Sequence, residues 1–389
     1  MANALVSMYM KCFALSEAQD LFDNLPLRNV VTWNALISGY VKNGHSYEAL
    51  SCFKQMCDDG ISPSEVTFVC VLKACGIIGS LQIGEDIDAE VRKQGLLQKD
   101  VVLGTALVDM YSKCGALEKA REVFELLPMQ TVVSWNALIT GYVHHGLGDE
   151  ALKCLIQMQN VGVCPDAITY ICILKACAVV GCLEIGEGID VEVRKQNLLQ
   201  RDVVLGTALV DMYSKCGAME KARAVFKQLP NKNIVTWNAL ITGYSQRGQH
   251  GDALKCFELM IQKGISPDVV TFLSVLNACS LSGRLDEAEK HFLDMTNKYG
   301  IRPNLHHYTC MVNGFGRVGY FDKVMETLKK MPSCDYLPLW HALLSACSKW
   351  GNVELGRMAF NNAIKIDNDD APAYVLMANI YAEANMNED

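Results

Sequence analysis

The stretch VVTWNALISGY at residues 30–40 decides the fold, because it occurs three times at a constant spacing. It returns as VVSWNALITGY at residues 132–142 and as IVTWNALITGY at residues 234–244, each time 102 residues further on. A second stretch, VVLGTALVDMYSKCGA at residues 101–116, stands unchanged at residues 203–218. Repetition at this level predicts an array of similar units in place of separate globular domains.

Each 102-residue unit divides into a standard, a long and a short copy, and the third unit passes into variant copies. We predict a partial short copy at 1–29; standard copies at 30–64, 132–166 and 234–268; long copies at 65–100, 167–202 and 269–304; short copies at 101–131 and 203–233; a short variant at 305–336; and extension segments at 337–370 and, in part, 371–389.

Every copy is predicted to form two helices, because apolar residues recur at helical spacing over residues 31–43 and again over 47–56 in the first standard copy. Positions are counted from the first residue of each copy. A glycine at position 15 of ten copies is expected to end the first helix in the left-handed conformation. Small residues at position 20 of the standard copies are expected where the two helices cross closely. The fold class is therefore all-α, an α-solenoid of helix–turn–helix repeats. The glycines are Gly44, Gly79, Gly115, Gly146, Gly181, Gly217, Gly248, Gly283, Gly319 and Gly351, and the small residues are Ala49, Ala151 and Ala253.

Composition narrows the class of protein. Half of the 389 residues are apolar, which is ample for a continuous core, and no apolar run approaches the roughly 18 residues of a membrane span. The net charge of −8 by itself does not indicate a protein that binds nucleic acid. The 17 cysteines include no C-x-x-C pair, and four of them share position 11 with tyrosines of other copies, which favours packing in a reducing compartment over metal or disulfide. These four are Cys75, Cys177, Cys279 and Cys347.

Positions 2, 5, 9 and 13 of the first helix are spaced three or four residues apart and therefore share one stripe. Stacked copies would turn this stripe into a groove lining. Position 2 is mostly aliphatic and suits the sandwiching of a flat base; its members are Val31, Val102, Val133, Val204 and Val235. Positions 13 and 9 supply cations that phosphates would meet, although a lysine that ends a helix can also simply offset the helix dipole. The cations are Lys11, Lys42, Lys73, Lys113, Lys175, Lys215 and Arg317.

Position 5 is polar in two of the three kinds of copy. It is asparagine in the standard copies and threonine in the short ones, whereas the long copies carry Val69, Ile171 and Leu273. Asparagine and threonine are poor helix formers, so a polar side chain on an apolar stripe calls for a polar partner. The edge of a base is one such partner; a local cap or a hydrogen bond in the core is the alternative. The polar residues are Asn34, Asn136, Asn238, Thr105 and Thr207.

The rotation of copies of 35, 36 and 31 residues resembles the pentatricopeptide repeat family, in its plant organellar branch of standard, long and short repeats. The openings VVTWNALISGY, VTFVCVLKAC and ALVDMYSKCGA carry this resemblance, and HHYTCMVNGFGRVG and LWHALLSACSKWGNVELG resemble the extension motifs of such arrays. The resemblance implies a right-handed superhelix that binds single-stranded RNA. It also implies a recognition role in C-to-U editing of mitochondrial or chloroplast transcripts.

The family reads one base per repeat through position 5 and the last residue, so the resemblance implies a set of base-reading pairs. It suggests a pyrimidine for Asn3 with Asn29, cytosine for Asn34 with Ser64, uracil for Asn136 with Asp166 and for Asn238 with Asp268, and adenine for Thr207 with Asn233. Thr105 with Thr131 and Thr309 with Tyr336 depart from the common pairs, and their bases stay open. The implied ligand is 5′-(C/U)-C-n-n-U-n-A-U-n-n-3′.

Signs of catalysis are missing from the sequence. A zinc deaminase needs H-x-E and C-x-x-C, and neither occurs in these 389 residues. We therefore expect no enzyme activity, no catalytic residues, no cofactor, no metal site and no membrane partner. A deaminase domain could follow in a longer protein, or be recruited in trans with other editing cofactors. We also expect the protein to be a monomer. The resemblance implies localisation in a mitochondrion or chloroplast. The alternatives are a tetratricopeptide-like scaffold for proteins and a factor for organellar RNA splicing or stability.

Overall fold

The computed structural model describes residues 2–333 and 335–384, and this part of the chain consists of helices joined by turns. Contacts divide the chain into two compact units, Met1–Ile189 and Asp190–Asp389, and helix α12 (Leu183–Lys195) crosses the boundary between them. No helix in the described residues is long and apolar enough to span a bilayer. Each unit is described by itself below.

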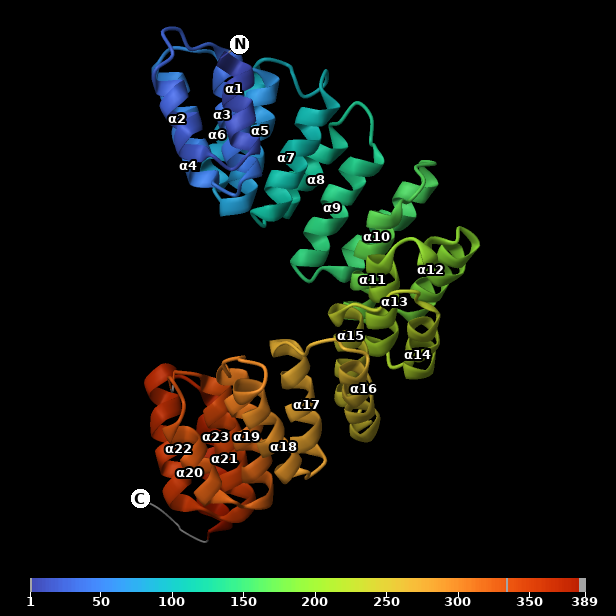
Figure 1. Ribbon diagram of the computed structural model, residues 1–389, viewed down its shortest axis with the longest axis vertical. Coiled ribbons are helices and arrows are strands. Elements are labelled where there is room, and N and C mark those ends of the chain that lie inside the picture. The colour runs from blue at the N-terminus through green and yellow to red at the C-terminus, as the bar shows by residue number, and fades with distance from the viewer. Residues whose placement is uncertain (1, 334, 385–389) are drawn as a thin grey trace. The chain divides into compact units, whose positions relative to one another are not determined.

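The first unit contains eleven complete helices and the start of α12 (Figure 1). Their bounds are α1 Ala2–Lys11, α2 Leu15–Asp23, α3 Val30–Lys42, α4 Ser46–Asp58, α5 Glu65–Ile78, α6 Leu81–Lys93, α7 Val101–Lys113, α8 Leu117–Glu125, α9 Val132–His144, α10 Gly148–Asn160 and α11 Ala167–Val180.

The second unit begins in α12, continues through a short 3-10 helix, η1 (Leu198–Gln200), and then repeats the same alternation. Its helices are α13 Val203–Lys215, α14 Met219–Gln228, α15 Ile234–Gln246, α16 His250–Gln262, α17 Val269–Leu281, α18 Leu285–Asn297, α19 Leu305–Val318, α20 Phe321–Lys329, α21 Leu337–Trp350, α22 Val353–Ile366 and α23 Ala371–Glu383.

The helices form two layers within each unit. An odd-numbered helix is the first of a pair and packs on the next odd-numbered helix, as α3 does on α5 and α15 on α17. An even-numbered helix packs on its own partner and on the following first helix, as α4 does on α3 and α5. Figure 1 shows this succession of helical pairs along each unit. The predicted all-α solenoid of helix–turn–helix repeats is confirmed.

Repeated residues fill the core between the two layers. Trp33, the fourth residue of VVTWNALISGY, is fully buried and meets Phe22 edge-on, with ring centroids 4.5 Å apart. Trp135 with Phe124 repeats this pair at 4.5 Å. Burial of large aromatic residues contributes much of the hydrophobic stabilisation of each copy. The small residues at position 20 are buried between the helices, because Ala49, Ala151 and Ala253 are all 0% exposed.

The cysteines at position 11 are packing residues. Cys75, Cys177, Cys279 and Cys347 are all 0% exposed. Burial raises the pKa of the Cys75 and Cys347 thiols to about 12, so both are protonated and unreactive at neutral pH. The packing interpretation drawn from the tyrosines at the same phase therefore agrees with the burial of Cys75, Cys177 and Cys347, whereas Cys279 has further neighbours that are described below.

The glycines at position 15 end the first helices as predicted. All ten have positive φ, between 65° and 84°. Gly79, Gly181, Gly319 and Gly351 directly follow their helices, and the others lie one residue beyond the capping residue. A side chain with a Cβ is strained in this conformation, whereas glycine adopts it freely.

Gly146 and Gly188 offer a matched test of this explanation. Gly146 has φ 75° between α9 and α10, whereas Gly188 lies inside α12 without a positive φ, and an added Cβ meets nothing within 4 Å at either position. Gly146→Ala should lower the free energy of unfolding by roughly 1–2 kcal/mol. Gly188→Ala should raise it by roughly 0.5–1 kcal/mol. Chemical denaturation measures both, and shifts of equal sign would contradict the explanation.

Candidate nucleic-acid interface

Positions 2, 5, 9 and 13 line one groove in the first unit. The groove has a volume of about 640 Å³ and lies along α5, α7 and α9. The lining residues are Val69, Lys73, Val101, Val102, Thr105, Ala106, Asp109, Lys113, Thr131, Val133, Asn136, Ala137 and Thr140. Helix α7 contributes all four positions of the predicted stripe. The prediction that these positions share one face is therefore borne out for this group of copies.

The position-2 valines are exposed. The exposed fractions of Val31, Val102, Val133, Val204 and Val235 lie between 55% and 65%. Apolar side chains exposed at one repeated phase are a recurrent feature of each unit, unlike single exposed residues, which need no explanation. The long copies carry the same feature, which the sequence reasoning left out: Val66, Ile168 and Val270 are 50–58% exposed. These three residues could have been found from the sequence, because they occupy position 2 of the long copies.

The last residue of a copy caps the first helix of the next one. Asp166 accepts a hydrogen bond from the backbone N–H of Thr169, and the Thr169 hydroxyl accepts one from the Asp166 backbone N–H. Ser64 and Asp268 form the same capping box at α5 and α17. Ser, Asp, Asn and Thr are the residues that serve best at this place. Capping alone therefore explains why the last residue is polar.

Each position-5 asparagine joins this cap through its side-chain amide. Asn136 donates from Nδ2 to Asp166 Oδ1 at 3.0 Å, and its Oδ1 accepts from the Thr169 hydroxyl at 2.6 Å. Asn238 makes the same two bonds, at 3.0 Å to Asp268 and at 2.6 Å from Thr271. The two residues of these two predicted base-reading pairs are thus in direct contact, although 30 residues separate them in the chain.

The carboxylate fixes which way the asparagine amide points. If the Asn136 amide were flipped, its oxygen would face Asp166 Oδ1, and two acceptors would repel each other. Burial alone would raise the pKa of Asp166, but hydrogen bonds from the Thr169 backbone and the Asn136 amide outweigh it and lower that pKa. Asp166 is therefore an ionised acceptor at neutral pH, and the amide nitrogen must face it.

The first standard copy leaves its amide less constrained. Asn34 Nδ2 donates to the Ser64 hydroxyl at 3.0 Å, and the Thr67 hydroxyl donates to Asn34 Oδ1 at 2.6 Å. A hydroxyl can donate as well as accept, so Ser64 and Thr67 tolerate either orientation of the amide. This copy therefore specifies the position of Asn34 but not the orientation of its amide.

These contacts are of the kind that the sequence analysis left open as the alternative to a base edge, namely hydrogen bonds within the protein. A base edge is not the only polar partner of the asparagines, because Asp166, Asp268, Ser64 and the position-3 threonines satisfy them within the protein. Asn136 and Asn238 are accordingly only 7% exposed. A small part of each side chain remains at the surface, and Asn136 lines the same groove as the exposed Val133. The threonines Thr67, Thr169 and Thr271 belong to the site, and sequence reasoning missed them.

The short copy at residues 203–233 uses a threonine relay in place of the amide. Thr207 is 9% exposed, and its Oγ1 lies 2.7 Å from Thr236 Oγ1, which in turn donates to Asn233 Oδ1 at 2.9 Å. Thr207 and Asn233 are therefore linked through Thr236. Thr105 donates to the carbonyl of Val101 at 2.7 Å and shares the groove with Thr131, which caps α9.

The remaining predicted pairs are arranged differently. Asn29 caps α3, and Asn3 lies half-buried on α1. Thr309 donates to the carbonyl of Leu305 at 2.8 Å. The hydroxyl of Tyr336 instead lies 2.8 Å from Nδ1 of His306. Of the predicted pairs, those with Ser64, Asp166 and Asp268 have side chains in direct hydrogen-bond contact, and these are the strongest candidates for base readers.

All seven predicted phosphate-contacting cations are exposed. Lys73 and Lys113 line the groove of the first unit. Lys113 donates to Asp109 at 2.7 Å, and Lys215 makes the same bond to Asp211 at 2.8 Å. These aspartates occupy position 9 of the short copies and were not considered in the sequence reasoning, although their spacing of four residues predicts the ion pairs. An exposed pair of this kind contributes only about 0.3–0.5 kcal/mol, so either lysine can exchange its partner.

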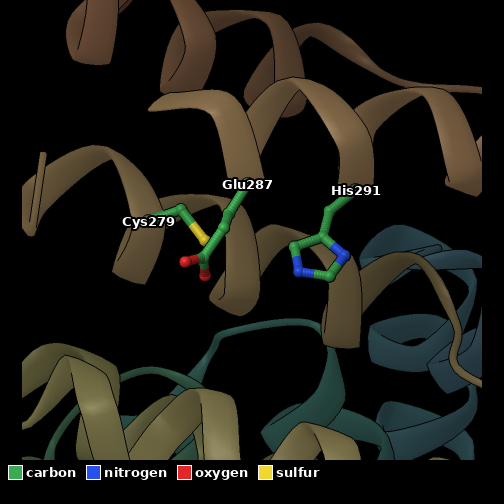
Figure 2. Close-up of side chains that lie close together, drawn as sticks. All are labelled: Cys279, Glu287 and His291. Atoms are coloured by element: carbon green, nitrogen blue, oxygen red, sulfur yellow. The ribbon is translucent and has the colours of Figure 1, made fainter. Parts of the chain in front are cut away.

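One group of side chains among the described residues could hold a metal ion. Cys279 of α17 with Glu287 and His291 of α18 place their ligand atoms within 4.8 Å of one another. Figure 2 shows the sulfur of Cys279 and the carboxylate of Glu287 directed toward each other, with the ring of His291 beside them. The group lies between the two helices of one copy and is separate from the stripe.

The threonine–asparagine contact has a measurable energetic consequence. Thr169→Val should lower the free energy of unfolding by roughly 1–3 kcal/mol, because it leaves the buried amide oxygen of Asn136 without its donor. Asn136→Ala alone and the double variant complete a double-mutant cycle. We expect a coupling of at least about 0.5 kcal/mol, and restoration by Thr169→Ser. Additive effects in chemical denaturation would mean that the two side chains do not interact.

Stacked two-helix copies, with exposed valines and capped amides along one face, place the chain in the class of α-solenoid repeat proteins. The PPR repeat family model matches residues 28–76, 130–179 and 232–281, and the PPR repeat model matches 105–129, 207–234, 270–299 and 306–336. The E motif model matches residues 350–389. The chain belongs to the pentatricopeptide repeat family.

Relatives in Arabidopsis thaliana match nearly all of the chain. It is 39% identical to pentatricopeptide repeat-containing protein At2g33680, over 98% of this chain and 52% of the relative. It is 37% identical to At3g02330, mitochondrial, over 99% and 45%, and 37% identical to At5g50390, chloroplastic, over 98% and 54%. The chain thus spans about half the length of these relatives.

A solved structure agrees with the fold. The crystal structure of the pentatricopeptide repeat protein PPR10 in complex with an 18-nt psaJ RNA element matches with a TM-score of 0.77. The match has 19% sequence identity and covers 99% of this chain and 60% of the other. At this identity the likeness concerns the fold alone.

Proposed function

We propose that this chain binds single-stranded RNA sequence-specifically and acts as a site-recognition factor in organellar C-to-U editing. The observation that carries the proposal is the repeated contact between the position-5 asparagine and the last residue, Asn136 with Asp166 and Asn238 with Asp268, in copies whose position-2 valines are exposed. The solved PPR10 complex supports RNA as the class of ligand, because its fold is similar and it holds an 18-nt RNA element.

The chemistry of the last residue supports different bases for different copies. Asp166 Oδ1 takes the bonds from Asn136 and Thr169, which leaves Oδ2 outside these contacts. A carboxylate oxygen can accept from N3–H of uracil and repels the N3 lone pair of cytosine. The Ser64 hydroxyl can instead donate to N3 of cytosine. The proposed pairs are therefore uracil for Asn136 with Asp166 and for Asn238 with Asp268, and cytosine for Asn34 with Ser64.

The valines supply the non-specific part of base binding. A base inserted between position-2 side chains of consecutive copies buries apolar surface on both of its faces, which lowers the free energy of the bound state. Unpaired bases offer both faces and their Watson–Crick edges, whereas paired bases do not. The arrangement therefore favours single-stranded RNA, with the exposed lysines placed for its phosphates.

An editing role has two supports. The E motif model matches residues 350–389, and several relatives are named mitochondrial or chloroplastic. We propose that the chain supplies recognition, in a mitochondrion or chloroplast, and that the deaminase is supplied by another part of a longer protein or in trans.

Selection from a random RNA pool with the purified chain, at a stated salt concentration, tests the proposal. We expect enrichment of 5′-(C/U)-C-n-n-U-n-A-U-n-n-3′ in single-stranded context, with the two uracils, which are assigned to the copies with an Asn–Asp contact, most strongly selected. The absence of any enriched sequence would contradict RNA recognition and would leave a protein-binding scaffold as the better hypothesis. Enrichment of a different sequence would contradict the base assignment alone.

A further inference from the structure

The third long copy contains a cluster of ligand-forming side chains that RNA recognition does not use. The thiol of Cys279, the carboxylate of Glu287 and the imidazole of His291 lie within 4.8 Å of one another (Figure 2). Glu287 and His291 are four residues apart on α18, so they share the face of that helix near Cys279. Sulfur, oxygen and nitrogen donors of these three types are the ligands that Zn²⁺ takes in proteins.

Comparison of the three long copies separates this cluster from ordinary packing. Cys279 occupies position 11, where the other long copies carry Cys75 and Cys177. Positions 19 and 23 are isoleucines in both of those copies, Ile83 with Ile87 and Ile185 with Ile189. Packing at this phase thus needs only apolar residues. In the third long copy alone, both isoleucines are replaced, by Glu287 and His291, and both replacements are ligand types beside the same cysteine.

The surroundings allow an ion to enter. Cys279 is fully buried, His291 is half-buried, and Glu287 is exposed, so the cluster runs from the core to the surface. The His291 ring lies between the buried thiol and the surface, with its ligand atom within 4.8 Å of those of Cys279 and Glu287. Glu287 also lies 3.5 Å from Arg284, an exposed ion pair that costs little to break.

The thiol presents the main cost of binding. Burial, with Glu287 nearby, raises the pKa of Cys279 to about 12, so the free protein holds this group as a thiol. Coordination to Zn²⁺ deprotonates a thiol outright, and the proton is released to solvent as the sulfur–metal bond forms.

We propose that Cys279, Glu287 and His291 form a site for a divalent transition-metal ion of the Zn²⁺ type, with water in the remaining coordination position. Such an ion would join α17 to α18 and stabilise the third long copy. This site goes beyond the proposed RNA recognition and does not depend on it.

Titration of the whole chain with Co²⁺, in the presence of a non-chelating reductant, tests the site directly. We expect one equivalent of Co²⁺ to bind with a sulfur-to-cobalt charge-transfer absorption, and Zn²⁺ to displace it. The variant Glu287→Ile with His291→Ile carries the residues of the other long copies and should therefore fold, as circular dichroism can verify. This variant should lose the absorption, whereas the control Cys75→Ser should keep it.

Thermal unfolding gives a second readout, because an ion that binds the folded state raises the unfolding midpoint. Zn²⁺ should raise the midpoint of the natural chain and leave that of the double-isoleucine variant unchanged. Two results would overturn the proposal: no sulfur-to-cobalt absorption in the natural chain, or the same absorption in the double-isoleucine variant, which would assign it to other cysteines.

Discussion

Replacing Asn136 and Asn238 together by threonine should change the preferred base at these two repeats from uracil to guanine. Threonine is shorter than asparagine and leaves room for a purine, while Asp166 and Asp268 can accept from N1–H of guanine as they would from N3–H of uracil. Each of the two changed repeats should then prefer guanine to uracil by on the order of 1–3 kcal/mol, roughly five- to two-hundredfold in affinity. Binding to RNAs that differ only at these two bases measures the change.

The fold should tolerate this double substitution. Thr207 already occupies position 5 of a short copy, where it donates to the carbonyl of Val203 at 2.8 Å and lies 2.7 Å from Thr236 Oγ1. A threonine at residues 136 or 238 can use the same two kinds of partner. An unchanged preference for uracil, in a variant that folds and still binds RNA, would refute the assignment of these positions as base readers.

Removal of two position-13 lysines, Lys113→Ala with Lys215→Ala, should weaken binding to all single-stranded RNAs alike. Each lysine that neutralises a phosphate contributes about 0.7 units to the slope of log K against log salt for single strands. The pair should therefore reduce this slope by roughly 1–2 units without changing base preference. Titrations at several salt concentrations, with matched and mismatched RNA, measure both properties.

Two lysines on second helices provide a matched control for the lysine variant. Lys153 and Lys255 are also exposed and each pairs with a carboxylate one turn earlier, Glu150 and Asp252, but they lie on the second helices α10 and α16. Lys153→Ala with Lys255→Ala removes the same charge and should leave the salt slope nearly unchanged. Equal losses in the two variants would mean that net charge, and not the stripe, governs binding.

The aspartates that pair with Lys113 and Lys215 should oppose RNA binding. Asp109 and Asp211 pair with Lys113 and Lys215 and bring negative charge to the same stripe. Asp109→Asn with Asp211→Asn should therefore tighten binding to every RNA and increase the salt dependence, because both lysines become available to phosphates without breaking an ion pair. Tighter binding that is confined to one RNA sequence would contradict this explanation.

Local sequence features predicted the parts of the fold that depend on neighbours in the chain. The left-handed glycines, such as Gly146, follow from a fixed phase after an apolar helix, and their conformation depends on nothing distant. The stripe of positions 2, 5, 9 and 13 follows from helical geometry alone, which is why α7 places Val102, Thr105, Asp109 and Lys113 along one groove.

The contacts of the candidate site were less accessible to sequence reasoning because they join different copies. Thr169 lies 33 residues from Asn136, and only the stacking of α9 on α11 brings its hydroxyl to the amide. The capping role of Asp166 could have been inferred from its place before a helix, since aspartate is a preferred cap. Capping therefore accounts for a polar residue at the end of each copy. Under the proposed RNA recognition, the base that is bound would account for the choice among Ser, Asp, Asn and Thr at that position.

Photocrosslinking tests most directly whether the position-5 residues meet unpaired bases. A single-stranded RNA of the sequence proposed above would carry 4-thiouridine at one of its two assigned uracils, and mass spectrometry would identify the crosslinked peptides. We predict crosslinks in residues 132–144 from the first uracil and in residues 234–246 from the second, the ranges of α9 and α15. Crosslinks confined to second helices such as α10 and α16, or the same peptides from both uracils, would contradict one-base-per-copy recognition along the stripe.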